Sequence, residues 1–195
     1  MAAVEAGADA LGFMFFEGSK RYLTPPAAAA IIRALPPFVA KVGVFVNATA
    51  ETVRATVAEC GLDTLQFHGE ETPEFCAQFA PLKVVKAFRI QEAASLDPVP
   101  GFAVDGWLLD SHVAGQRGGT GERFNWDLAV QAKELGRPII LAGGLTPENV
   151  ADAIQQVWPF GLDVSSGVES APGQKDVGLM RRFLSIVRQA EHDLA

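Results

Sequence analysis

The sequence predicts an α/β fold, a (β/α)8 barrel, from three observations. Short apolar runs that end in small or polar residues alternate with stretches of helical pattern along the 195 residues. Such alternation predicts a parallel sheet with helices outside it. The runs are almost continuously apolar, which is typical of strands covered on both faces. Seven strands favour a closed barrel over an open doubly wound sheet, and the count is one short of eight.

The predicted strands are runs of similar length. They lie at 10–16, 41–47, 64–69, 83–90, 106–111, 138–144 and 161–167. Helical patterns fill the intervals, at 24–36, 51–61, 71–80, 125–136, 146–157 and 176–194. Several of them begin with Thr or Asn, as helix N-caps do. The interval 91–101 predicts at most a short helix.

The first residues, AAVEAG, predict the end of a helix that Gly7 caps. In a barrel this helix would connect the first strand to the second. We therefore expect strand 1 to be absent from this chain, and residues 1–195 to form one N-terminally truncated barrel domain.

Composition narrows the function classes. A hydrophobic content of 49% and a charged content of 20% are typical of a soluble globular domain. A net charge of -7 without clustered Lys and Arg argues against a nucleic-acid partner. Cys60 and Cys76 are too few for a disulfide scaffold and lack metal-ligand spacing. Since neither a membrane span nor a secretory signal is visible, we expect a cytoplasmic protein without a membrane partner.

Two glycine-containing loops follow the last two predicted strands, AGGL at 142–145 and SSGV at 165–168. In (β/α)8 barrels these loops often hold a phosphate, together with the N-terminus of a helix. Glycine lets main-chain N–H groups come close to an anion, although Gly pairs and Ser-Gly are also common turn residues. The predicted phosphate-binding residues are Gly143, Gly144, Ser166 and Gly167.

Asp110 ends its predicted strand and is followed by a glycine-rich loop at 115–122. A general acid needs a raised pKa, which partial burial under a closing loop could supply. The alternatives are a carboxylate that only caps main-chain amides and a loop that only connects. The loop matches neither of the glycine-rich nucleotide-binding motifs.

Two further residues are candidates for substrate binding. Arg21, in GSKRY after the first visible strand, could hold a carboxylate in a bidentate contact, or could be a solvated loop residue. His68 ends the strand at 64–69 and faces either the site or the core; we predict that it lines the substrate site. Cys60 and Cys76 lie in helical stretches, where a small buried side chain is expected. No zinc or cofactor signature is visible, so we expect no metal and no cofactor.

Seven segments together resemble the phosphoribosylanthranilate isomerase family of tryptophan biosynthesis, in order and in spacing. They read GADALGFMFFEGSKRYLTP, PPFVAKVGVFVN, LQFHGEE, LLDS, GGTGERFNW, LAGGLTPENV and DVSSGVESAPGQKD. The resemblance implies a TIM barrel of the ribulose-phosphate-binding type, acting as monomer or homodimer. It also implies a cofactor-free Amadori rearrangement of N-(5-phosphoribosyl)anthranilate to 1-(2-carboxyphenylamino)-1-deoxyribulose 5-phosphate.

The resemblance also assigns roles to residues. Asp110 matches the acid that opens the sugar ring, and Arg21 matches the arginine that holds the anthranilate carboxylate. The phosphate loops match Gly143, Gly144, Ser166 and Gly167, and Asp163 takes a supporting role in substrate binding. The family's base is a cysteine of a first-strand Lys-Ile-Cys-Gly motif, to which neither Cys60 nor Cys76 belongs.

Without that base the chain would be inactive, and the alternative function is a noncatalytic barrel remnant that binds a sugar phosphate. The related isomerase of histidine biosynthesis fits less well. It would use two aspartates at opposite sides of the site, and the strand at 83–90 supplies none.

Overall fold

The computed structural model describes residues 1–110 and 126–194. They divide into two compact units. The first contains residues 1–87 and 102–105, and the second contains residues 88–101 and 106–195. The interpretation of residues 1–195 as one domain stays a prediction.

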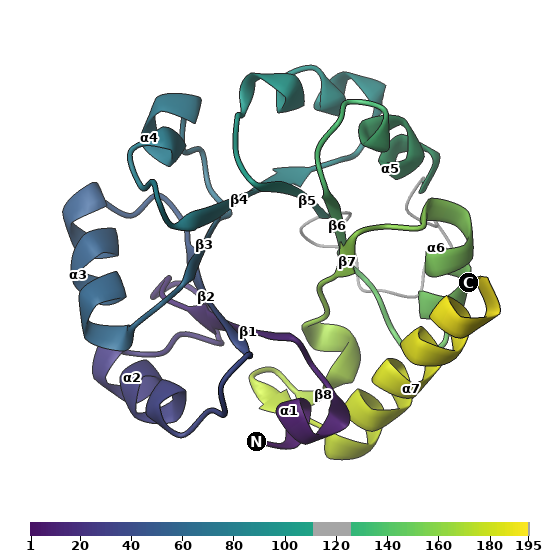
Figure 1. The fold of residues 1–195 in the computed structure, drawn as a ribbon, viewed down its shortest axis with the longest axis horizontal. Coiled ribbons are helices and arrows are strands. Elements are labelled where there is room, and N and C mark those ends of the chain that lie inside the picture. The colour runs from purple at the N-terminus through teal and green to yellow at the C-terminus, as the bar shows by residue number, and fades with distance from the viewer. Residues whose placement is uncertain (111–125, 195) are drawn as a thin grey trace. The chain divides into compact units, whose positions relative to one another are not determined.

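The first unit is a parallel sheet with helices along it. Its strands pair in chain order and in parallel, with Gly12 opposite Val42, Val44 opposite Gln66 and Phe67 opposite Lys86. In Figure 1 its helices lie on one side of these strands. The elements are α1 (Ala2–Ala6), β1 (Ala10–Met14), α2 (Pro25–Arg33), β2 (Ala40–Phe45), α3 (Ala50–Cys60), β3 (Thr64–Phe67), α4 (Pro73–Ala77) and β4 (Lys83–Arg89), of which residues 83–87 belong to this unit.

Local side chains explain where the helices of the first unit begin and end. Thr24, Thr49 and Thr72 are the N-caps of α2, α3 and α4, and each hydroxyl accepts a hydrogen bond from a main-chain N–H of the first turn. Gly7 and Gly61 end α1 and α3 in the left-handed conformation, with φ of 102° and 68°. The predicted caps at Gly7 and Thr24 are confirmed, whereas Thr146, which begins the predicted helix at 146–157, is not the N-cap of α6.

The second unit repeats the arrangement. Its strands are parallel, with Asp110 opposite Ala142 and Leu141 opposite Leu162. Helix α6 begins at Val150, after the N-cap Asn149, so the predicted start at residue 146 was too early. The elements are η1 (Ala93–Leu96), η2 (Val99–Gly101), β5 (Gly106–Asp110), α5 (Trp126–Lys133), β6 (Ile139–Ala142), α6 (Val150–Val157), β7 (Gly161–Leu162), η3 (Ser166–Val168), the antiparallel pair β8 (Glu169–Ala171) and β9 (Gln174–Lys175), and α7 (Val177–Leu194).

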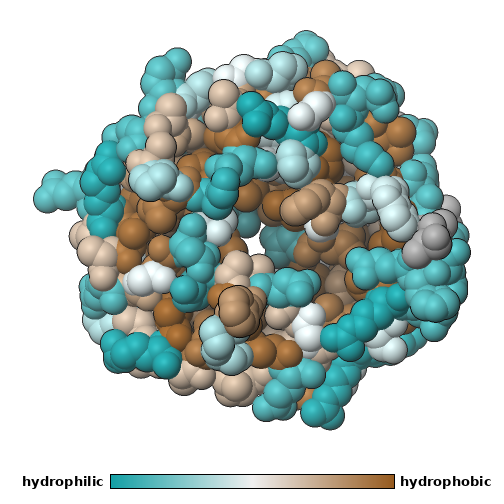
Figure 2. Space-filling view, in the orientation of Figure 1, coloured by the Kyte–Doolittle hydropathy of each residue, from teal (hydrophilic) through white to brown (hydrophobic). Residues whose placement is uncertain are grey.

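Each unit has an apolar core made by its strands. In the first unit Phe67 is fully buried and its ring lies 5.4 Å from that of Phe75 and 5.2 Å from that of Phe79. In the second unit Trp107, Leu109 and Leu141 are buried. Burying a side chain of this size contributes about 1.5–3 kcal/mol to the stability of the fold. The outer side of α7, at the lower right of Figure 2, is mainly hydrophilic.

No helix among the described residues combines the length and the apolar character that crossing a membrane requires.

Candidate active site

The predicted acid lies at the carboxyl end of the sheet of the second unit. Asp110 is the last residue of β5 and is half-buried, and its register partner Ala142 is the last residue of β6. Gly143 therefore follows at the same edge. Asp163 comes directly after β7, and its main-chain N–H donates to the carbonyl oxygen of Leu141 at 2.9 Å. Asp110, Gly143 and Asp163 thus follow three neighbouring strand ends.

The predicted phosphate-binding residues lie in the β6 loop (residues 143–146) and the β7 loop (residues 163–168). Gly143 and Gly144 have φ of 83° and 64°, in the left-handed region that glycine adopts without strain. Gly167 lies against the β6 loop, because a β-carbon there would overlap the carbonyl oxygen of Leu145. Glycines at these positions leave main-chain N–H groups uncovered by side chains, an arrangement suited to an anion.

Two side chains brace these loops, and sequence reasoning identified neither. Asn149 accepts a hydrogen bond from Thr146 N–H at 2.8 Å and donates one to Gly144 O at 3.0 Å. Lys175 Nζ, on β9, donates to the carbonyl oxygen of Ser165 at 2.8 Å and to Glu169 Oε1 at 2.9 Å. The role of Lys175 depends on the β8–β9 pairing, which no sequence pattern predicted.

In the first unit, the predicted substrate-binding residues also follow strand ends. Arg21 is half-buried in the loop after β1, and its main-chain N–H donates to Ser19 Oγ at 3.1 Å. His68 follows β3 directly, and its main-chain N–H donates to Phe45 O at 2.8 Å. Its Nδ1 lies 3.4 Å from Gln66 Nε2. Both residues therefore stand at the carboxyl edge of the same parallel sheet.

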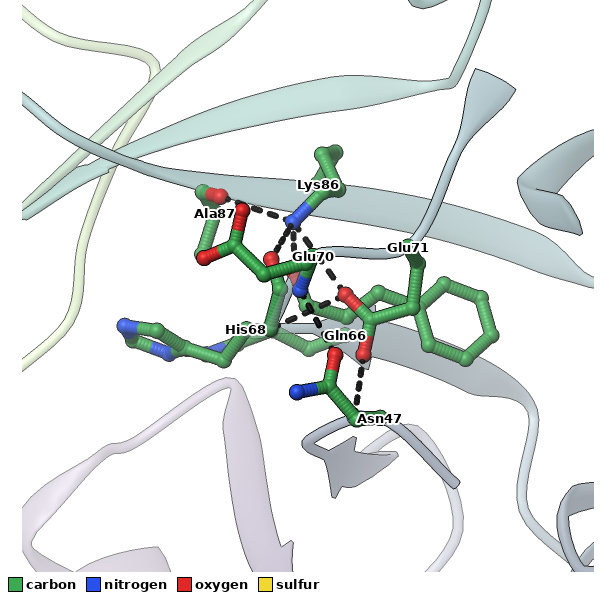
Figure 3. Close-up of polar contacts among 9 residues, drawn as sticks. Asn47, Gln66, His68, Glu70, Glu71, Lys86 and Ala87 are labelled. Atoms are coloured by element: carbon green, nitrogen blue, oxygen red, sulfur yellow. Dashed lines mark hydrogen bonds and ion pairs between the residues drawn. The ribbon is translucent and has the colours of Figure 1, made fainter. Parts of the chain in front are cut away.

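A buried ion pair lies behind His68 (Figure 3). Lys86 Nζ is 3.2 Å from Glu71 Oε2, and the two side chains are only 4% and 2% exposed. Charged residues are almost never this buried unless they are paired. The signal in the sequence was a lysine inside the apolar run 83–90, but the partner could not be inferred from it.

The two cysteines are free, buried and on helices, Cys60 on α3 and Cys76 on α4. Burial raises the pKa of both thiols, that of Cys76 to about 11. A thiol that stays protonated at neutral pH is a poor proton acceptor. This agrees with the expectation that neither cysteine is the catalytic base.

The predicted closing loop at 115–122 lies outside the described residues. Within residues 1–110 and 126–194, no three His, Cys, Asp or Glu side chains are grouped so that they could hold a metal ion.

Comparison with known proteins identifies the family. A family model described as N-(5'phosphoribosyl)anthranilate (PRA) isomerase matches residues 1–186. The N-(5'-phosphoribosyl)anthranilate isomerase of Geobacter metallireducens is 53% identical over 182 residues, which are 93% of this chain and 89% of that protein. The chain belongs to this family. Its activity is the isomerisation of N-(5'-phosphoribosyl)anthranilate in tryptophan biosynthesis.

Solved structures give the fold of the isomerase. The crystal structure of phosphoribosyl anthranilate isomerase from Thermotoga maritima matches with a TM-score of 0.91 and 40% identity, over 96% of this chain and 92% of that one. A second such isomerase, in complex with reduced 1-(o-carboxyphenylamino)-1-deoxyribulose 5-phosphate, matches with a TM-score of 0.87 and 38% identity, over 96% and 91% of the two chains. The α/β fold of the TIM-barrel type predicted from sequence is confirmed.

The expected absence of strand 1 is not supported. The isomerase of Citrifermentans bemidjiense is 55% identical over 183 residues, which are 94% of this chain and 88% of that protein. Such matches over most of both chains do not support the alternative of a noncatalytic remnant either, and the assignment as an isomerase is confirmed.

Proposed function

We propose that Asp110 is the general acid of the isomerisation, and that the β6 and β7 loops hold the substrate's phosphate. The position of Asp110 supports the assignment: it ends β5, opposite the last residue of β6. Catalytic groups of TIM-barrel enzymes stand at the carboxyl ends of strands. Asp110 donates a proton to the furanose ring oxygen while the C1–O bond breaks, and the anthranilate nitrogen supplies the electron pair that forms an iminium.

The phosphate is held by main-chain N–H groups around Gly143, Gly144, Ser166 and Gly167. These residues follow β6 and β7, and Gly167 approaches the main chain of Leu145 without a side chain between them. Main-chain donors in a turn are aimed at an anion without the entropy loss of ordering long side chains. Asp163, at the end of β7, supports binding of the sugar.

Arg21 and His68 bind the anthranilate end of the substrate. The guanidinium of Arg21 has the planar geometry that pairs with a carboxylate through two parallel hydrogen bonds. His68 contributes to the same end of the substrate from the end of β3, the third strand of the same sheet.

The rearrangement needs a second group, a base that removes the C2 proton so that the iminium becomes an enol amine and then the ketone product. The raised pKa of the buried thiols argues against Cys60 and Cys76 in this role. No metal or cofactor is needed, since each step moves only protons and electron pairs within the substrate.

Two wider properties belong to the same proposal. The Thermotoga maritima relative is described as a dimeric enzyme from which monomers were generated. This chain is proposed to act as a monomer or homodimer on a phosphorylated small molecule, in the cytoplasm.

The substitution Asp110→Asn tests the acid. It keeps the size of the side chain but removes the transferable proton, so kcat should fall by about 10² to 10⁴-fold, the usual contribution of a positioned acid. The decay of substrate fluorescence measures turnover, and thermal unfolding checks the fold. The matched control is Asp127→Asn, on α5 of the same unit, whose carboxylate accepts a hydrogen bond from Gln156 at 2.9 Å and lies on a helix rather than at a strand end. Near-normal kcat in Asp110→Asn would refute the assignment.

A further inference from the structure

The loop after β3 (residues 68–71) is tied to a buried charge pair, which the proposed chemistry does not use. Lys86 Nζ donates to Gly69 O at 2.7 Å, Ala87 O at 3.1 Å, Glu71 Oε2 at 3.2 Å and Phe67 O at 3.3 Å. An ammonium has three N–H donors, so these oxygens share them. Phe67 and Gly69 are the neighbours of His68. One buried cation therefore binds the main chain on both sides of that histidine.

The carboxylate of the pair fixes the same loop from its own side chain. Glu71 Oε2 accepts from Gly69 N–H at 2.9 Å, and Oε1 accepts from Asn47 N–H at 2.7 Å. Asn47 Oδ1 in turn accepts from Glu70 N–H at 2.7 Å. Asn47 follows β2 and has a left-handed φ of 53°, which asparagine tolerates better than most residues. The pair thus joins the segments that follow β2 and β3 to the middle of β4.

Close packing leaves this loop little freedom. A β-carbon on Gly69 would overlap Asn47 Oδ1 and would come within 2.9 Å of Asn47 N. Among the described residues, every buried side-chain nitrogen or oxygen atom has a hydrogen-bond partner. A fully satisfied buried polar network is rigid and fixes one arrangement of its members. In Figure 3 the His68 ring extends away from Lys86 and Glu71, so the pair contacts the main chain beside His68 and not its ring.

We propose that Lys86 and Glu71 are positioning residues, which hold the main chain around His68 so that its imidazole meets the substrate in one orientation. This inference rests on the proposed contact between His68 and the substrate. A group that fixes the position of a substrate-contacting residue can raise the reaction rate by a large factor, even though it never touches the substrate itself. A buried pair without this role would be a weak way to stabilise the sheet, because desolvation offsets much of its attraction.

Strand β4 offers a matched control. Lys83, three residues before Lys86, pairs with Asp105 at 2.8 Å, but its side chain is 70% exposed and it is the first residue of the strand. Exposed pairs contribute little to stability. Lys83→Met should leave kcat/KM within about twofold of wild type, since an exposed ion pair away from the site carries no positioning role.

The test is a double-substitution cycle at temperatures well below each unfolding midpoint. Glu71→Gln keeps the shape of the side chain but removes the charge, and should lower kcat/KM about tenfold or more. His68→Ala should lower it at least as much. If Glu71 acts through His68, adding Glu71→Gln to the His68→Ala variant should lower kcat/KM by no more than about twofold further.

Different outcomes refute different statements. If His68→Ala alone has wild-type kcat/KM, the proposed His68 contact is wrong and the inference fails with it. A second set of outcomes overturns the positioning role while the contact between His68 and the substrate stands. In these outcomes His68→Ala has a lowered kcat/KM, and Glu71→Gln either has a normal kcat/KM or lowers it by the same factor with and without His68.

Two further variants separate positioning from stability. Lys86→Met combined with Glu71→Gln removes both charges, so its unfolding midpoint should rise above that of either single variant, because no charge stays buried without a partner. Its kcat/KM should stay low; recovery of activity together with stability would overturn the inference. If Glu71→Gln does not fold, Asn47→Gly is the substitute variant. Asn47 is exposed, and glycine removes its contact with Glu70 N–H while keeping the left-handed φ. This substitution should lower kcat/KM about threefold in the wild-type protein and should have no effect in the His68→Ala background.

Discussion

The loop after β3 and the pair of β6 and β7 loops are shaped in opposite ways. The β3 loop is held from behind by a buried cation and carboxylate, and it presents a side chain, His68. The β6 and β7 loops are held by close contact between bare main chains, at Gly167 and Leu145, with polar braces outside them. A loop that presents a side chain needs its main chain fixed, whereas a loop that presents main-chain N–H groups needs its side chains removed.

This difference makes the two regions sensitive to different substitutions. The β3 loop should respond to lost charge, because a buried ion without its partner is strongly destabilising. The β7 loop should respond to added volume, because a main-chain oxygen cannot rotate away as a flexible side chain can. The following predictions test the contrast, from the largest expected effect on catalysis to the smallest.

Among the loop variants, Gly167→Ala should have the largest effect. The new β-carbon would overlap Leu145 O, so the β6 and β7 loops must separate. We expect KM and the inhibition constant of inorganic phosphate to rise about ten- to hundredfold, equivalent to about 1.4–2.8 kcal/mol. Steady-state kinetics with inorganic phosphate as competitor measures both quantities.

The control is Gly161→Ala, on β7 of the same unit. Its nearest neighbour for a new β-carbon is Ile140 Cγ1 at 3.7 Å, an ordinary contact. Both constants should stay close to wild type there. Unchanged phosphate inhibition in a folded Gly167→Ala variant would show that the close approach has no part in anion binding.

The same contrast explains what the sequence could predict. Strand positions follow from apolar runs and local caps, so the run 83–90 predicted β4, observed at Lys83–Arg89. Gly143, Gly144, Ser166 and Gly167 could be proposed as a phosphate site from the sequence, because a loop that would bind through its main chain carries its signal in local composition. The Lys86–Glu71 pair was missed, since it depends on the register that places Phe67 opposite Lys86, a contact between residues distant in sequence.

Lys175, which holds the β7 loop through Ser165, should have a smaller effect on substrate binding than Gly167. Lys175→Met removes the donor to Ser165 O and Glu169 Oε1, and the loop then loses its fixed geometry. We expect KM to rise about three- to tenfold with kcat little changed, as when an interaction common to the bound states is lost. Kinetic assays over a range of substrate concentrations separate the two constants.

Lys133→Met is its matched control. Lys133 Nζ also donates to two main-chain carbonyls, Val157 O at 2.8 Å and Trp158 O at 2.9 Å, but at the end of α6 rather than in a proposed substrate loop. It should lower the unfolding midpoint and leave KM unchanged. Equal rises of KM in both variants would mean that Lys175 acts only through general stability.

Cys76 reports on the β3 region without taking part in catalysis. Burial raises the pKa of its thiol to about 11, the Lys86 charge lowers that pKa and the Glu71 charge raises it. Because this pKa is raised above its ordinary value of 9.0, folding favours the protonated thiol. The resulting stability is complete below pH 9 and is lost as the pH rises through about 11, by at most about 3 kcal/mol.

Because the charges of Lys86 and Glu71 act on the Cys76 pKa in opposite directions, removing each charge should shift this pKa in a different direction. In a Cys60→Ala background, Glu71→Gln should lower the Cys76 pKa, and Lys86→Met should raise it, while Lys83→Met should leave it in place. Ultraviolet absorbance of the thiolate follows the titration, and chemical unfolding at pH 8 and pH 11 follows the linked stability. The same shift of this pKa in both pair variants would mean that Lys86 and Glu71 are not an ionised pair, and the contrast between the two regions would then rest on the glycine loops alone.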